Sequence, residues 1–327
     1  MPLFRRLKEK IRGRSRSADR PQLSSDETTT ATSSSIGLFL VAKNPGNQHE
    51  RPQYPVDIIA VHGLNGDAFT TWTHPNGKMW IRDFLPGFLP GCRVYTYGYP
   101  SKIFFNPSLS RVQEYARGLL SSVRDLQDDS EQGPRSIIFV CHSLGGIVCK
   151  QALVFAHEDN INYGAVLSSI IGVTFLGTPH RGSNLATFGS IAANIINTFS
   201  AVIQPAIVKR DLLNHLNFDS DELQNLFLSS RNRLASIAVV SFYETMPMPP
   251  ISSPVVDRAS AIIGVSHEDI IPLNENHRDL CRFPSENESY KAVSRAIRRI
   301  AYRSSELARP LERPSIDSSK RCEYLLH

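Results

Sequence analysis

The 327-residue sequence contains no long hydrophobic run, and this absence excludes a chain built on membrane-spanning helices. No apolar stretch approaches the roughly 18 to 20 residues that cross a bilayer as a helix. The N-terminus is basic and lacks the apolar segment of a secretory signal. We therefore expect an intracellular protein that is not secreted. It is expected to be cytoplasmic or peripherally attached to a membrane.

Cysteine is scarce, and the sequence lacks several motifs that bind metals or nucleotides. The five cysteines are scattered and form no C-x-x-C pair, so neither a disulfide framework nor a zinc site is indicated. G-x-G-x-x-G, G-x-x-x-x-G-K-[ST] and H-E-x-x-H are also absent, which argues against dinucleotide-binding, P-loop and zincin chemistry. We expect a function that needs no metal and no organic cofactor.

Net charge is small outside the first 20 residues. These hold eight Lys or Arg against Glu9 and Asp19, whereas the whole chain has a net charge of +5, so the remainder is close to neutral. The body therefore has no overall basic charge of the kind that indicates nucleic-acid binding.

Both ends of the chain have compositions typical of disorder. Residues 1–35 are basic and then rich in Ser and Thr, and residues 306–327 are also expected to be a disordered tail. Phe4, Leu7 and Ile11 share one helical face, so residues 1–20 are predicted to contact an anionic membrane surface. A solvated flexible arm and an organelle-targeting segment remain alternatives.

Between these ends, residues 36–305 alternate strand and helix patterns, which predicts an α/β fold with a mostly parallel sheet covered by helices on both faces. A helical, cap-like insertion is expected at about residues 184–233. The predicted helices cover 108–126, 146–157 and 288–303. The predicted strands cover 38–42, 57–62, 93–97, 137–141, 171–176, 237–242 and about 270–273.

The spacing of apolar residues changes from a strand pattern to a helix pattern at Ser143, and this change indicates a nucleophile. The apolar run 137–140 suits a buried strand, and helical spacing begins directly after the segment Cys141-His142-Ser143-Leu144-Gly145. This segment matches the nucleophile elbow G-x-S-x-G with Cys141 replacing the first glycine. The sharp turn of an elbow exposes the serine hydroxyl to an ester carbonyl, so Ser143 is the predicted nucleophile.

Two backbone amides are predicted to form an oxyanion hole. Leu144 begins the helix after the elbow, where the amide groups point outward and the helix dipole favours negative charge. Leu64 follows the strand 57–62 in the loop "HGLNG" and is expected to supply the second amide. His62, Gly63, His142 and His180 are expected to line the cleft.

A base and an acid should follow the serine in the order Ser, acid, His. His277 comes after the last predicted strand and is the predicted base. Glu244 ends the strand before it and is the predicted acid, with Asp257 as the alternative. His180 precedes both acids, which breaks the expected order, so it and Arg181 are given a structural or substrate-edge role.

The sequence resembles the serine-active-site-containing (SERAC-type) α/β-hydrolases, a family of serine esterases or lipases. The matching segments span residues 36–305 in the order of the family and include "VHGLNG", "WIRDFLPGFLP", "YTYGYPS", "FVCHSLGGIVCKQAL", "VTFLGTPHRGS", "VSFYET", "VVDRASA" and "NHRDLCRF". The resemblance implies an α/β-hydrolase fold, hydrolysis of an acyl ester that includes lipid esters, and association with endoplasmic reticulum or mitochondrial membranes.

The expected function is that of a serine hydrolase that cleaves carboxylic acyl esters through an acyl-enzyme intermediate. Ser143, His277 and Glu244 would form the triad, and the amides of Leu64 and Leu144 would stabilise the oxyanion. The alternative is a catalytically weak, hydrolase-like module for interaction or signalling.

Overall fold

The central feature of the computed structural model is a seven-stranded sheet, counted over the described residues 35–44, 54–101, 109–130, 133–180, 191, 194–195 and 220–307. The strand order is β1-β3-β2-β4-β5-β6-β7, and only β1 is antiparallel to its neighbour among these strands. The strands are β1 (Gly37–Lys43), β2 (Val56–Val61), β3 (Arg93–Gly98), β4 (Ser136–His142), β5 (Ile170–Leu176), β6 (Ala238–Glu244) and β7 (Asp269–Leu273).

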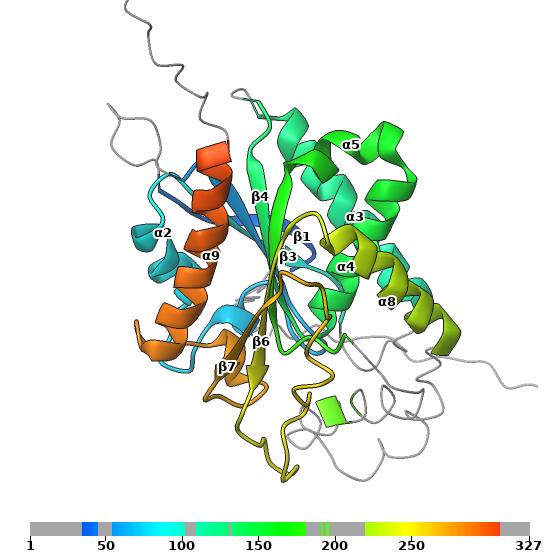
Figure 1. Ribbon diagram of the computed structural model, residues 1–327. Coiled ribbons are helices and arrows are strands. Elements are labelled where there is room, and N and C mark those ends of the chain that lie inside the picture. Colours follow the sequence, from blue (N-terminus) through cyan, green and yellow to red (C-terminus); the bar gives the residue numbers. More distant parts are fainter. Residues whose placement is uncertain are drawn as a thin grey trace, which may run out of the picture. The chain divides into compact units, whose positions relative to one another are not determined.

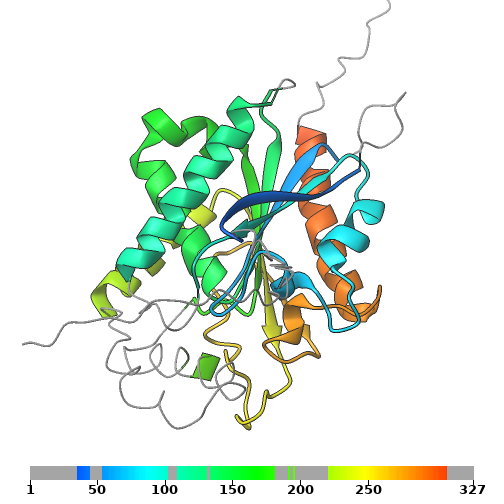
Figure 2. The ribbon, with the colours of Figure 1, turned by 180° about the vertical axis from the view of Figure 1, so that it is seen from behind.

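Helices cover both faces of this sheet. Helices α3, α4, α5 and α8 lie on one face, and α2 and α9 lie on the other (Figure 1). The view from behind shows the same two layers (Figure 2). The helices are α1 (Trp80–Asp83), α2 (Leu85–Phe88), α3 (Leu109–Asp128), α4 (Leu144–Glu158), α5 (Asn160–Ser169), α8 (Ser220–Leu234) and α9 (Glu288–Leu307), with 3-10 turns at Thr70–Trp72 and Asp279–Cys281.

The burial pattern explains why the sheet lies in the middle. Every residue of β2 is buried, and so is β4 after its first residue, as expected for parallel strands packed on two sides. On α9, Tyr290, Val293 and Ile297 share one buried face against the sheet. The helix therefore packs through an apolar stripe and keeps its arginines toward solvent.

The predicted α/β architecture with a mostly parallel sheet is confirmed, and all seven predicted strands are present close to their expected bounds. The helices predicted at 108–126, 146–157 and 288–303 correspond to α3, α4 and α9. Helix α5 was not predicted, because its sequence has no clear apolar stripe. The predicted tail begins too early, since α9 continues to Leu307.

Several predictions fall mainly outside the described residues. These are the arm over residues 1–35, the membrane contact assigned to residues 1–20, and the rest of the tail to residue 327. Of the insertion predicted at about 184–233, the structure describes only residues 191, 194 and 195 and most of α8. Ile191 and Ile195 are buried, as their shared helical stripe indicates.

Lys150 is a buried amine within α4, the helix that follows Ser143. Burial lowers its pKa from 10.5 to about 7, and only 2% of the residue is exposed. Among the described residues, no carboxylate forms an ion pair with it. A charged amine in this position destabilises the fold, because desolvation is not offset by a partner.

We expect Lys150→Met to raise the free energy of unfolding at pH 7 by about 2 to 4 kcal/mol, because a pKa shift of this size means that the charged amine destabilises the folded state. The unfolded amine keeps a proton up to about pH 10.5, whereas the folded amine loses it near pH 7. The advantage of the Met variant should therefore be full at pH 7 and shrink toward pH 10. Urea unfolding at both pH values measures it, with the exposed Lys78→Met as the control. Equal shifts for the two variants would contradict this expectation.

Candidate active site

The candidate site lies at the carboxyl edge of the sheet, where the parallel strands β2, β4, β5, β6 and β7 end side by side. Val61 at the end of β2 pairs with Cys141 of β4, and His142 pairs with Leu176 at the end of β5. Glu244 ends β6 and pairs with Leu273 at the end of β7. Because parallel strands end at the same edge, the loops after them meet there, as in other open α/β sheets.

Ser143 occupies a sharp turn between β4 and α4. Its backbone has φ 52° and ψ −123°, and this positive φ is uncommon for a residue with a side chain. The amide of Ser143 donates to the carbonyl of Leu176 at 3.0 Å, and the hydroxyl of Thr178 donates to the carbonyl of Ser143 at 3.1 Å. These contacts hold the strained turn in place.

The glycines around Ser143 are required by close backbone approaches. A Cβ atom at Gly145 would collide with the carbonyl oxygens of Val61 and His62. A Cβ atom at Gly63 would lie 2.8 Å from the Cβ of Ser143.

Cys141, which replaces the first glycine of the motif, is fully buried in the core, and burial raises its thiol pKa well above the ordinary value. It is therefore a packing residue and not a reactive thiol.

The three predicted triad residues are brought together at hydrogen-bond distance. His277 Nε2 lies 3.0 Å from Ser143 Oγ, and His277 Nδ1 lies 2.9 Å from Glu244 Oε2. All three residues are at most 2% exposed. An ionised carboxylate only accepts, so His277 Nδ1 carries the hydrogen and donates a hydrogen bond to Glu244. Nε2 is then left to accept a hydrogen bond from the serine hydroxyl.

Glu244 is the acid that reaches His277, and Asp257 is not. The second oxygen of Glu244, Oε1, accepts a hydrogen bond from the amide of Val256, so both carboxylate oxygens have partners. Asp257 is exposed, and its Oδ1 accepts from the amide of Ser260 at 2.8 Å. Asp257 thus stabilises a turn in the loop that follows Val256.

The loop after β2 approaches the elbow at Gly63, the residue before Leu64. Leu64 and Leu144 are both buried, and neither amide donates to another residue in the described part of the chain. The first amides of a helix such as α4 lack an intrahelical acceptor. Both predicted oxyanion donors are therefore available to a negatively charged oxygen near Ser143.

Residues 99–101 hold the loop after β2, which carries the predicted oxyanion donor Leu64, in place. The hydroxyl of Tyr99 donates to the carbonyl of His62 at 2.7 Å, and the amide of Tyr99 donates to His62 Nε2 at 3.2 Å. Ser101 Oγ donates to the carbonyl of Gly66 at 2.8 Å, and the Ser101 carbonyl accepts from the amide of Asn65 at 2.9 Å. Sequence reasoning missed this role, although Tyr99 and Ser101 belong to the "YTYGYPS" segment that carries the family resemblance.

We expect Tyr99→Phe to lower kcat for ester hydrolysis by about 3- to 10-fold with little change in KM, because one buried hydrogen bond contributes about 1 kcal/mol. Steady-state kinetics on a soluble ester measure this effect. The matched control is Tyr97→Phe, which removes a hydroxyl that donates to the carbonyl of Tyr115 at 3.1 Å instead. Equal losses in both variants would assign the effect to core packing.

The histidines predicted to line the cleft are buried and have structural contacts. His62 stacks on Tyr99 with ring centroids 4.2 Å apart, and burial lowers its pKa to about 4. His142 contacts the main chain of His277, and burial lowers its pKa to about 3. His180 lies against Phe175, with ring centroids 4.5 Å apart, and its amide donates to Ser260. Arg181 lies outside the described residues.

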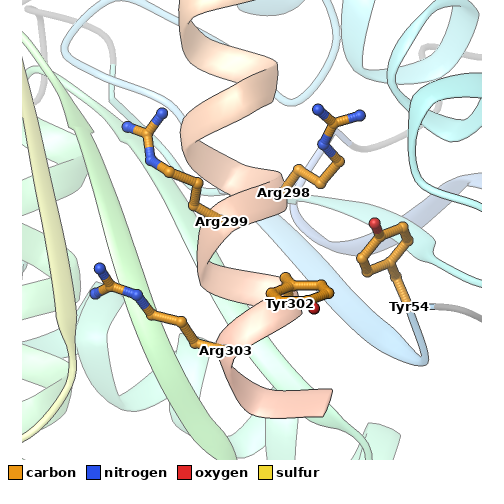
Figure 3. A pocket seen from close by; sticks show the side chains of 5 residues that line it. All are labelled: Tyr54, Arg298, Arg299, Tyr302 and Arg303. Atoms are coloured by element: carbon orange, nitrogen blue, oxygen red, sulfur yellow. The ribbon is translucent and has the colours of Figure 1, made fainter. Parts of the chain in front are cut away.

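A surface pocket of about 210 Å³ lies away from this site, at the C-terminal end of α9 (Figure 3). Arg299 pairs with Asp269 at 2.6 Å, and the Arg298 guanidinium lies 4.3 Å from the centre of the Phe88 ring. Tyr54 precedes β2, so the pocket lies at the opposite edge of the sheet from Ser143. The pocket is lined by Tyr54, Arg298, Arg299, Tyr302 and Arg303.

Within the described residues, no three His, Cys, Asp or Glu side chains gather in a way that could hold a metal ion. None of the described helices is long and apolar enough to cross a membrane.

Comparisons with known proteins place this geometry in context. Residues 95–239 match a family model described as the PGAP1-like alpha/beta domain. Protein SERAC1 of Danio rerio is 24% identical over 256 residues, which cover 72% of this chain and 37% of that protein. Protein SERAC1 of Homo sapiens is 24% identical over 266 residues, which cover 73% of this chain and 38% of that protein. The match thus spans well under half the length of these relatives.

The fold also matches a solved structure, that of Bacillus licheniformis lipase BlEst2 in its mature form. The sequences are 15% identical, the match covers 79% of this chain and 97% of the lipase, and the TM-score is 0.53. At this identity the likeness concerns the fold alone. The chain has the α/β-hydrolase fold, and its resemblance to the SERAC-type hydrolase family is confirmed.

Proposed function

We propose that this protein is a serine hydrolase that cleaves carboxylic acyl esters. The observation that carries the proposal is the chain of two hydrogen bonds from Ser143 Oγ through the imidazole of His277 to Glu244, at 3.0 Å and 2.9 Å. A serine hydroxyl becomes a nucleophile when a base accepts its proton, and an imidazole does so when a carboxylate orients it.

The reaction proceeds in two steps. Ser143 Oγ attacks the ester carbonyl while His277 Nε2 accepts its proton and then returns it to the leaving alcohol. The amides of Leu64 and Leu144 donate to the oxyanion of the tetrahedral intermediate. Water, deprotonated by His277, then releases the acyl group from Ser143. Glu244 holds His277 and stabilises the imidazolium that forms in each step.

The proposed substrates are carboxylic esters, and the esters to be assayed include lipid esters. Support comes from the fold shared with a lipase and from the family resemblance. A panel of esters graded by acyl length would define the preference, because pocket contacts discriminate by about 1 to 3 kcal/mol per methylene.

Reaction with a fluorophosphonate probe tests whether Ser143 is activated. We expect the probe to label the full-length protein at Ser143 and to stop ester hydrolysis in proportion to labelling. An unlabelled, folded protein without esterase activity would favour the alternative, a hydrolase-like interaction module.

A further inference from the structure

His142 lies between the two loops that complete the candidate site. It precedes Ser143 at the end of β4, and its Nε2 lies 2.8 Å from the carbonyl oxygen of His277. The rings of His142 and His277 are 5.1 Å apart between centroids. On the other side, a Cβ atom at Gly63 would lie 3.1 Å from His142 Nδ1. One buried side chain therefore binds the base loop and lies close to Gly63 in the loop after β2.

The direction of the hydrogen bond follows from its partner. A carbonyl oxygen only accepts, so His142 Nε2 carries the hydrogen and donates a hydrogen bond to the carbonyl of His277. Burial and the neighbouring His277 lower the pKa of His142 to about 3, which keeps its imidazole neutral near pH 7. A neutral ring in this position does not repel the positive charge that His277 acquires when it accepts the proton of Ser143.

The contacts of Glu244 and Ser143 hold the imidazole of His277, whereas the contact of His142 is with its main chain. These contacts fix His277 at its ring and at its backbone. Because His142 is adjacent to Ser143 in the chain, its hydrogen bond ties the base directly to the strand that carries the nucleophile.

We propose that His142 is a positioning residue, which donates to the His277 carbonyl and thereby holds the base at reacting distance from Ser143. This inference rests on the proposed serine hydrolase function. A displacement of about 1 Å can lower a rate by about 100-fold, so a single hydrogen bond at this point affects turnover more than substrate binding.

A matched pair of variants tests the role. His142→Gln keeps a hydrogen-bond donor, the side-chain amide, on a side chain of similar reach. His142→Met gives a side chain of nearly the same shape as Gln, without the donor. We expect His142→Met to lower kcat by about 10- to 100-fold with KM within about 2-fold. His142→Gln should retain most of the wild-type kcat. Labelling of Ser143 by a fluorophosphonate should slow in His142→Met in parallel with kcat.

Either of two kinetic results would overturn the inference: full activity in His142→Met, or equal losses in the Met and Gln variants at equal melting temperatures. If Ser143→Ala keeps wild-type activity, the proposed function fails instead. Should His142→Met not fold, the ¹⁵N signals of His142 in the wild-type protein decide. They should indicate a neutral ring protonated at Nε2 from about pH 5 to pH 8, and a ring protonated at Nδ1 would contradict the donor role.

Discussion

Replacing Ser143 with alanine is expected to lower ester hydrolysis by about 10³- to 10⁶-fold and to leave the fold intact. The hydroxyl of Ser143 lies at hydrogen-bond distance from His277 Nε2, so its removal eliminates the nucleophile. The backbone contacts with Leu176 and Thr178 do not involve this hydroxyl and remain. Turnover of a soluble ester and the melting temperature of both proteins measure the two parts of this prediction.

The control for Ser143→Ala is an exposed serine outside the site, such as Ser168→Ala. This variant should keep wild-type turnover. Undiminished turnover by a folded Ser143→Ala protein would exclude the mechanism proposed above, whatever the result for the other site residues.

Glu244→Gln is expected to lower kcat by about 10²- to 10⁴-fold, as loss of the orienting carboxylate does in other triads. An amide in this position cannot stabilise the imidazolium of His277 as a carboxylate does. If the NH₂ group of the glutamine faces His277, two hydrogen-bond donors, this NH₂ and Nδ1–H, oppose each other and the hydrogen bond is lost. Steady-state kinetics on the purified variant measure the loss, with thermal unfolding as the check that Val256 and its loop remain in place.

Asp257→Asn provides the matched comparison, because it makes the same chemical change at the alternative acid. Its carboxylate is exposed and contacts only the turn at Ser260 among the hydrogen bonds described above, so kcat should change by less than about 2-fold. If Asp257→Asn is the more damaged of the two folded variants, Asp257 supports the base and Glu244 is a structural neighbour.

Strong local patterns predicted most of the fold. The strands β2 and β4 are continuous apolar runs, and α9 has a clear stripe through Tyr290, Val293 and Ile297, so their positions follow from periodicity. Helix α5 lacked such a stripe and was missed. The antiparallel pairing of β1 was also not predicted, because strand direction depends on partners that are distant in the sequence.

Site residues were predictable where a motif imposes a conformation. The elbow around Ser143 needs small neighbours, and Gly145 indeed lies against the β2 backbone. The choice between Glu244 and Asp257 was left open, because it depends on a loop path that no local pattern determines. The contact of Tyr99 and the hydrogen-bond partner of His142 could not be predicted for a similar reason, since both side chains donate to backbone carbonyls and any residue supplies such an acceptor.

The two hydrogen bonds that join Ser143, His277 and Glu244 also determine when during folding the protein can become active. Glu244 and His277 are 33 residues apart, and Ser143 and His277 are 134 residues apart. Contacts between such distant positions form late, since the chain must first close large loops. Ser143 should therefore stay unreactive toward a fluorophosphonate until β6 and β7 have joined the sheet. In a refolding experiment, the return of labelling would then follow the completion of the sheet and lag behind the return of helical signal.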